Sequence, residues 1–479
     1  MKRIFLSAFL LVSLSLSAQN IDRKQVVERN NPHVVTMDSL NSLSVGNGGF
    51  AMTVDGTGLQ SFPKSYSKGV PLGTMSDWGW HSFANPENYK PEESWRYYDY
   101  GRGRKEPYVT QIKEDKRKKA AGDWYRVNPH RLHLGTLGLS LGSDPKNIQQ
   151  VNQILDMWDG MIKSSFIYHG RAYQVETTCH PELDMIATHV QSKGSIAFDI
   201  RFAYPTGGHC DDACDWNKDH LHSTMLVSQD KNSAVLKRTI DETVYFVMLR
   251  WQGTAKLKQK GKNFYQLQSK SADLKLTCEY AEQISSESKT FAEVADAAKI
   301  YWNRYWQKGA MVDFGQCKDP RAQEMERRVV LSQYLLAIQD AGETPPQETG
   351  LTYNSWFGKF HLEMILWHQA QFALWGHPEL LEHSLSWYFK AEPNARKIAR
   401  RQGFKGVRWM KMTDPDAGEA PSSVGSFLIW QQPHLIYLAE LLYRADPSPA
   451  ILQKYAKLVD ETAEFMGDFA EYDKEKDRY

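Results

Sequence analysis

The sequence has almost no excess charge of either sign. Its 58 Lys and Arg residues face 57 Asp and Glu residues, which gives a formal net charge of +1 at pH 7 over 479 residues. Nucleic-acid-binding proteins usually carry a basic excess or a basic stripe. We therefore expect no nucleic-acid partner.

Long hydrophobic runs are also scarce. After residue 18, no stretch approaches the about 18 uninterrupted apolar residues that indicate a membrane-spanning helix, so we expect no membrane span. Within residues 1–18, Lys2 and Arg3 precede an apolar run, and Ala18 ends a small-residue segment with no following cysteine for a lipid anchor. This pattern predicts a cleaved signal peptide and an exported protein, either periplasmic or secreted.

Cysteine is rare: the chain has five, and only Cys210 and Cys214 are close in sequence. An odd number leaves at least one thiol unpaired in an exported protein. His209 and neighbouring acids make this segment a candidate metal site, but its C-x₃-C spacing lacks the C-x₂-C regularity of zinc sites. We expect the two cysteines to pair or to lie in a loop, with no metal and no cofactor.

Aromatic residues are plentiful, with 15 Trp and 23 Tyr, and such side chains suit carbohydrate clefts as well as large cores. From about residue 34 to residue 280 the pattern is that of strands and turns. Residues 154–193 show it best, because apolar and polar residues alternate around turns at Asp159-Gly160 and His169-Gly170. This region predicts a large antiparallel sandwich.

After residue 286 the apolar period changes from 2 to about 3.6. A sheet region followed by a helical region indicates two domains rather than an interleaved α/β fold. The expected helices span residues 290–308, 322–341, 363–375, 378–389, 395–401 and 449–472, and the first of them joins the two domains.

Residues 403–444 hold the chemistry that is typical of sugar binding. A basic and aromatic cluster precedes a turn-rich acidic loop at 413–423, and an apolar helix follows with Pro433 in its first turn. Indoles stack on sugar rings, Gln, His and Arg bind hydroxyls, and a carboxylic acid can protonate a glycosidic oxygen. Composition alone fits a helix cap with solvated loop charges equally well.

This segment resembles glycoside hydrolase family 65 and its relatives, in which a strand end is followed by a loop that carries the general acid. The matching residues are Gly406-Val407-Arg408-Trp409 and Gly418-Glu419. The resemblance implies that Glu419 is the general acid. The second acid of the family's loop and the residues after it are replaced by Ala420, Pro421 and Ser422.

Residues 351–367 resemble the family's segment at the start of a barrel helix that contacts the sugar. Phe360, His361 and Glu363 are the matching positions, which implies that Glu363 binds sugar hydroxyls. A first-turn glutamate favoured by the helix dipole is an equal alternative. His361 and His368 are seven residues apart, a spacing that does not suit a metal pair on a helix, so we expect both to act as hydrogen-bonding groups.

Residues 76–81 and 128–133 in the sheet region are candidate substrate-facing loops, with surface turns and cross-strand polar pairs as the alternative. Two indoles flank Gly79 in the first of them. The complete set of expected substrate-binding residues is Trp78, Trp80, Trp356, Lys359, His361, Glu363, Arg408, Trp409, Lys411, Gln431 and Gln432.

The resemblance implies a fold of an N-terminal antiparallel β-supersandwich, a linker helix and an (α/α)₆ toroid. We expect a signal peptide at 1–18, the sandwich at 19–285, the linker at 286–317 and the toroid at 318–479. A complete toroid needs about twelve helices and about 300 residues. We therefore expect a partial toroid in a fragment of a longer reading frame, with the catalytic base beyond Tyr479.

The predicted function is that of an exported glycoside hydrolase that acts on α-linked oligosaccharides with inversion, using Glu419 as general acid. Its expected partner is an oligosaccharide or polysaccharide substrate. One alternative is a carbohydrate-binding relative without turnover. The other is a polysaccharide lyase, which the order of sheet before helices disfavours.

Overall fold

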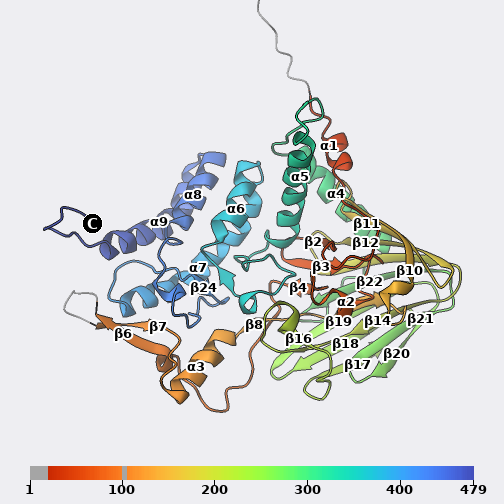
Figure 1. The fold of residues 1–479 in the computed structure, drawn as a ribbon, viewed down its shortest axis with the longest axis horizontal. Helices are drawn as coiled ribbons and strands as arrows, with labels where there is room; N and C mark the ends of the chain where they lie inside the picture. Colours follow the sequence, from red (N-terminus) through yellow and green to blue (C-terminus); the bar gives the residue numbers. More distant parts are fainter. Residues whose placement is uncertain (1–19, 100–104) are drawn as a thin grey trace, which may run out of the picture.

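The computed structural model describes residues 20–99 and 105–479, so the predicted signal peptide at 1–18 lies outside the described residues. Figure 1 shows antiparallel sheets from the first half of the chain and a group of helices from its last third. We call residues 20–285 the β part and residues 318–479 the helical part. The predicted fold class, a β-sandwich followed by a linker helix and a helical domain, is confirmed.

The largest sheet has nine antiparallel strands, and it contains the predicted meander. Strands β11 and β12 pair from Met161↔Thr178 to Tyr168↔Arg171, which leaves His169 and Gly170 as a two-residue turn with positive φ values of 47° and 74°. Such turns match the twist of a hairpin. In spatial order the strands are β1 (His33–Val34), β10 (Ile148–Asp156), β11 (Met161–Tyr168), β12 (Arg171–Cys179), β13 (Met185–Ser192), β22 (Asp273–Ala281), β19 (Thr243–Gln252), β18 (Ser233–Ile240) and β17 (Ser223–Gln229).

Smaller sheets complete the β part. In β14 (Ile196–Arg201), Phe198 and Ile200 are fully buried in the core, whereas Asp199 and Arg201 lie on the other face. The alternation of one strand thus gives its sheet a core face and an outer face. The four-stranded sheet has the order β20 (Ala255–Gly261), β21 (Phe264–Ser269), β14 and β9 (Thr136–Leu139), and the three-stranded sheet has the order β2 (Leu43–Gly46), β3 (Phe50–Val54) and β4 (Thr74–Ser76). The two-stranded sheets are β5 (Trp80–His81) with β8 (His130–Arg131), β6 (Trp95–Asp99) with β7 (Lys105–Val109), and β15 (Tyr204–Pro205) with β16 (Cys214–Asp215).

The described residues of the β part also contain three α-helices, α1 (Arg23–Arg29), α2 (Pro63–Tyr66) and α3 (Lys116–Val127). Helices α2 and α3 lie in the region where only strands and turns were predicted. Helix α3 is capped by Asp115, whose side chain accepts the backbone N–H of Lys118 at 2.9 Å. Its sequence buries only Ala121 and Gly122, so it shows no apolar stripe by which a helix is recognised.

Hairpin β6–β7 and helix α3 form an extension of the β part, described at residues 95–99 and 105–127, that we call the arm. Figure 1 shows the arm beneath the helical part. Arg126 donates to the carbonyl of Pro421 at 2.6 Å. The ring of Phe427 lies 5.0 Å from that of Tyr98 and 5.1 Å from that of Tyr108. The arm therefore makes the loop before α8 part of an interface between the two halves of the chain.

The linker helix is α4 (Phe291–Gln307). It begins with a capping box, in which Thr290 and Glu293 bond to each other's backbone N–H groups. Its buried face includes Trp302 and Trp306, and the indole of Trp306 donates to the carbonyl of Met157 at 2.7 Å. Helix α4 thus packs against the nine-stranded sheet, next to β12, β13 and β22.

The helical part is built from α5 (Ala322–Gln339), α6 (Ile365–Leu374), α7 (Pro378–Arg401), α8 (His434–Ala445) and α9 (Pro449–Phe469), with the two-stranded sheet β23 (Phe360–His361) and β24 (Met412–Thr413) between them. The prediction of separate helices at 378–389 and 395–401 is wrong. A single helix runs through Pro393, because the one backbone bond that proline loses is outweighed by a continuous buried face from Leu380 to Ala399.

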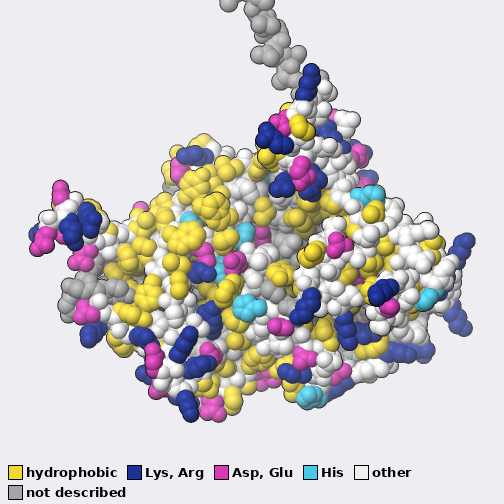
Figure 2. Space-filling view, in the orientation of Figure 1, with side chains coloured by type: hydrophobic (Ala, Val, Ile, Leu, Met, Phe, Trp, Pro, Cys, Tyr) yellow, Lys and Arg dark blue, Asp and Glu magenta, His cyan; other side chains and the backbone are white. Residues whose placement is uncertain are grey.

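No helix within the described ranges has the length and apolar character to cross a membrane. The helical part nevertheless exposes large apolar side chains, which Figure 2 shows as a field over α6 and α8. They include Trp367, Leu374, Trp430, Tyr437 and Leu452.

Candidate active site

The short sheet of β23 and β24 brings two predicted site segments together. Phe360 pairs with Thr413 and His361 pairs with Met412, and the N–H of Leu362 donates to the carbonyl of Lys411 at 2.8 Å. Segments about fifty positions apart in sequence therefore lie side by side. This pairing places Glu363 beside Lys411.

Glu363 forms an ion pair with Lys411, with 2.6 Å between Oε1 and Nζ. Its side chain is only 7% exposed, and burial raises the pKa of its carboxyl although Lys411 opposes the shift. The second oxygen, Oε2, has no hydrogen-bond partner among the described residues. A carboxyl with a raised pKa and an unused oxygen is suited to proton transfer.

The indole of Trp356, whose residue is 38% exposed, lies beside this ion pair. Lys411 Nζ is 5.9 Å and Arg126 Cζ is 5.5 Å from its ring, and its backbone N–H donates to His209 Nδ1 at 3.0 Å. The arm, a loop of the β part and the helical part thus meet at one side chain. Trp356 and Phe357 both have positive φ values, 47° and 67°, a strained backbone that is typical of functional sites.

Two histidines and a second carboxylate lie next to Glu363. Burial lowers the pKa of His361 to about 3 and that of His368 to about 4, so both are neutral at pH 7. His361 Nδ1 donates to the carbonyl of Lys359 at 3.0 Å, which turns Nε2 toward Glu348 Oε2 at 3.7 Å. Within the described structure, Glu348 Oε2, His361 Nε2 and His368 Nδ1 have no hydrogen-bond partner. Buried polar atoms of this kind are usually satisfied by water or by a ligand.

We call these residues the Glu363 cluster: Arg126, His209, Glu348, Trp356, His361, Glu363, His368 and Lys411. Figure 2 shows acidic, basic and histidine side chains gathered in the middle of the face, between the apolar field of the helical part and the β part. Among the residues that the structure describes, no group of three or more His, Cys, Asp and Glu side chains could hold a metal ion. The cluster offers an aromatic face, hydroxyl-binding groups and one candidate proton donor.

Arg126, His209 and Glu348 were not predicted as site residues. Arg126 lies in a helix that was not predicted, and Glu348 lies in a segment without a motif. His209 belongs to the segment that was considered for metal binding, but its contact with Trp356 was not predicted. Contacts across 147 and more positions leave no local pattern in a sequence.

Glu419, the predicted general acid, forms a bidentate pair with Arg401. Arg401 Nη2 lies 2.7 Å from Oε1, Nη1 binds Oε2, and the Glu419 side chain is 6% exposed. This geometry uses both carboxyl oxygens as acceptors, whereas a general acid must carry a proton on one of them. The role of Glu419 stays a prediction that requires this pair to open.

Arg408, Trp409, Gln431 and Gln432 are almost fully buried. Gln432 accepts the backbone N–H of Trp409 at 2.9 Å, and Gln431 donates to the Trp409 carbonyl at 3.0 Å. Arg408 donates to the carbonyl of Leu428 at 2.6 Å. These side chains fasten residues 407–409 to the segment that leads into α8, and their predicted contact with substrate stays a prediction.

Lys359 and Trp80 hold the two halves of the chain together, whereas Trp78 is bonded within the β part. Lys359 Nζ donates to the carbonyl of Asn128 at 3.0 Å, and burial lowers its pKa to about 8. The ring of Trp80 packs edge-on against Phe360 at 5.6 Å, and Trp78 donates to Asp184 at 2.7 Å. Their predicted role in substrate binding likewise stays a prediction.

Comparison with known proteins gives a likeness of fold. A structure described as a kojibiose phosphorylase from the human microbiome aligns with a TM-score of 0.63 and 11% identity, over 94% of this chain and 61% of its own. A bacterial glucoamylase in complex with acarbose aligns with a TM-score of 0.42 and 10% identity, over 65% of this chain and 49% of its own. A family GH92 α-mannosidase from Bacteroides thetaiotaomicron aligns with a TM-score of 0.26 and 8% identity, over 70% of this chain and 56% of its own.

No family model and no curated protein matches the sequence. This chain spans about 61% of the length of the phosphorylase structure. At this level of identity the likeness is one of fold: a β-sandwich joined to a helical domain.

Proposed function

We propose that this protein is an exported glycosidase that hydrolyses α-linked oligosaccharides with inversion. In this proposal, Glu363 is the carboxyl that donates the proton to the leaving oxygen. One observation carries the proposal: Glu363 combines a pKa raised by burial with an oxygen that has no partner among the described residues, next to the exposed indole of Trp356. The likeness of fold to a structure described as a phosphorylase of kojibiose supports a sugar substrate. The apolar run at 1–18 supports export.

In this proposal Trp356 stacks on a sugar ring, and the neutral imidazoles of His361 and His368 bind hydroxyls. Glu363 transfers its proton to the glycosidic oxygen as the bond to the anomeric carbon breaks, and water attacks that carbon from the opposite face while a general base takes the proton of that water. Lys411 holds one carboxyl oxygen of Glu363, so that the other oxygen keeps a fixed direction. Glu419 is the alternative acid, and in the closed pair with Arg401 it orders the loop at 413–423.

The test compares Glu363→Gln with Glu419→Gln on kojibiose, maltose and an aryl α-glucoside. General acid catalysis is worth about 10²–10⁴-fold, so Glu363→Gln should lower kcat on the disaccharides by roughly that factor. The loss should be smaller on the aryl glycoside, whose leaving group needs little protonation. Equal losses on all three substrates would remove Glu363 as the acid. The anomer released first, followed by NMR, tests inversion.

A carbohydrate-binding relative without turnover is the second candidate. The closed Arg401–Glu419 pair favours this candidate, because both carboxyl oxygens of Glu419, the predicted general acid, are bonded to Arg401. A wild-type protein that binds the disaccharides but cleaves none of the three substrates would establish this second function in place of the first.

A further inference from the structure

A groove of about 630 Å³ lies on the outer face of the four-stranded sheet, and none of its lining residues belongs to the Glu363 cluster. Its floor is set by strand register. Asp199 of β14 lies between Gly138 of β9 and Gln266 of β21, and Arg201 lies opposite Phe264. Because neighbours across a sheet point to the same face, these side chains form one polar and aromatic surface.

Two segments of the β part wall the groove. A Cβ on Gly138 would lie 2.3 Å from the carbonyl oxygen of Gln60, so the glycine allows residues 60–65, which include the start of α2, to pass close to the edge strand β9. Trp216 and Asp219 line the groove from the turn that follows β16. The volume falls within the roughly 300–1,000 Å³ that is typical of small-molecule sites.

The polar side chains of the floor are held in place by one another. Gln266 donates to Asp199 and to Ser140, both at 2.8 Å, and Arg201 donates to the other oxygen of Asp199 at 3.1 Å. The guanidinium of Arg201 lies 4.1 Å from the centre of the Phe264 ring. The bond to Asp199 uses one of the five N–H donors of a guanidinium. A fixed network with further donors and acceptors is suited to binding hydroxyl groups.

The charges of this groove balance. Lys64 and Arg201 face Asp199 and Asp219, so the groove has no net preference for an anion or a cation. This balance, with Trp216 at the wall, matches an uncharged ligand that has both an apolar face and many hydroxyls.

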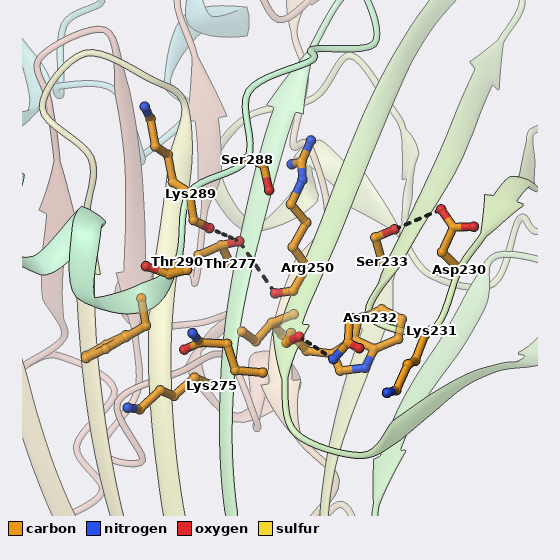
Figure 3. A pocket seen from close by; sticks show the side chains of 14 residues that line it. Asp230, Lys231, Asn232, Ser233, Arg250, Lys275, Thr277, Ser288, Lys289 and Thr290 are labelled. Atoms are coloured by element: carbon orange, nitrogen blue, oxygen red, sulfur yellow. Dashed lines mark hydrogen bonds between the residues drawn. The ribbon is translucent and has the colours of Figure 1, made fainter.

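A second hollow of the β part, of about 360 Å³, provides a contrast (Figure 3). Its lining carries the four cations Lys231, Arg250, Lys275 and Lys289, and the rings of Trp251 and Phe291 are buried. Figure 3 shows polar groups of this hollow bonded to the chain, as where the Thr277 hydroxyl donates to the Lys289 carbonyl at 3.2 Å. It therefore offers neither an open ring nor balanced charge.

We propose that the groove on the four-stranded sheet binds a neutral oligosaccharide chain, as a glycan-binding site separate from the Glu363 cluster. Trp216 packs on the apolar face of a sugar ring, and Asp199, Arg201 and Gln266 bind its hydroxyls. The proposal stands on the groove alone and does not require the Glu363 cluster to be catalytic. Where that cluster is catalytic, the groove holds a long substrate on the enzyme between cleavage events.

The experiment measures binding of maltoheptaose, cellohexaose, xylohexaose and mannohexaose by isothermal titration calorimetry. It uses Glu363→Gln as the parent protein, so that cleavage does not interfere. We expect at least one of the four to bind, and Trp216→Ala and Arg201→Ala to weaken its binding by about tenfold each, since 1.4 kcal/mol corresponds to tenfold. Lys275→Ala, in the hollow of Figure 3, is the matched control and should bind as the parent does.

The Arg201 side chain is 49% exposed, so its truncation leaves the fold intact and keeps the test decisive where Trp216→Ala misfolds. Absence of binding for all four probes would overturn the proposal. So would unchanged affinity in Arg201→Ala, or an equal loss in Lys275→Ala. Turnover of disaccharides by Trp216→Ala and Arg201→Ala, each made in the wild-type protein, reports separately on the Glu363 cluster. Normal turnover with lost binding supports two sites, and lost turnover in a folded variant would show that the groove and the cluster are one site.

Discussion

Two ion pairs with the same chemistry have different geometry in this protein. Lys411 engages one oxygen of Glu363, whereas Arg401 engages both oxygens of Glu419. A lysine is a point charge, and an arginine is a planar fork that matches a carboxylate. The first arrangement leaves an oxygen for a substrate, and the second stabilises the loop that carries Glu419.

The difference predicts separate effects on stability. Glu419→Gln leaves the partly buried Arg401 without a charged partner, so we expect the free energy of unfolding to fall by about 1–3 kcal/mol. Glu324→Gln is the control, because Glu324 pairs with Arg327 and Arg328 at the surface and should change stability by less than about 1 kcal/mol. Urea unfolding measures both. Equal, small changes would show that the Arg401–Glu419 pair does not support the fold.

At the scale of elements, the sequence predicts the helices and turns that depend on residues close together in the chain. The hairpin turn at His169-Gly170 and the helix expected at 290–308 depend on neighbouring residues, and both are present, the helix as α4. Helix α3 was missed because it carries almost no buried face of its own. The same limit applies to the site: Glu363 was found from a motif, whereas Arg126 reaches it only because the arm folds onto the helical part.

A close approach of two elements provides a second prediction. Gly406 has φ +65°, and a Cβ there would lie 2.1 Å from the carbonyl oxygen of Glu461 in α9. Gly406→Ala should therefore lower the free energy of unfolding by roughly 2–4 kcal/mol. Gly467 lies in α9 with open space around it, so Gly467→Ala is the control and should raise the free energy of unfolding by about 0.5–1 kcal/mol. If thermal unfolding gives the same small shift for both, the contact with α9 is loose.

The whole molecule has one main core that crosses from the β part to the helical part. Trp80 packs on Phe360, and Phe360 packs on Trp387 of α7, with ring centres 5.6 Å apart in each case. Val45 of β2 and Leu438 of α8 belong to the same cluster of buried residues. We therefore expect both halves to unfold together.

Buried histidines distributed over this core predict its response to acid. Burial lowers the pKa of His130 and of His361 to about 3, and that of His222 and of His368 to about 4. As the pH falls below 6.5, the unfolded chain binds these protons first, so stability is lost between pH 6.5 and about 4. Each histidine contributes up to about 1.4 kcal/mol per pH unit.

Carboxyls with a raised pKa oppose this trend. Burial raises the pKa of Asp55 to about 6 and that of Asp77 to about 7, and it also raises the pKa of Asp184, Glu279, Asp340 and Glu363, so protonating these six groups stabilises the fold as the pH falls. Burial lowers the pKa of five further histidines, His81, His133, His180, His209 and His434, which brings the histidines to nine. The histidines outnumber the carboxyls, so the free energy of unfolding should be lower at pH 5 than at pH 7, in one transition for both halves. Calorimetry at the two pH values tests this. An unchanged or higher stability at pH 5, or two separate transitions, would contradict it.

The arm sets an order of events during synthesis. Its contacts join residues separated by almost 300 positions, as between Arg126 and Pro421. At about 5–20 residues per second, the ribosome needs about 15–60 s to make the intervening chain. During that time the rings of Tyr98 and Tyr108 have no Phe427 to pack on. The arm is therefore a late-docking element, because the residues of the helical part that it packs on are the last to be made.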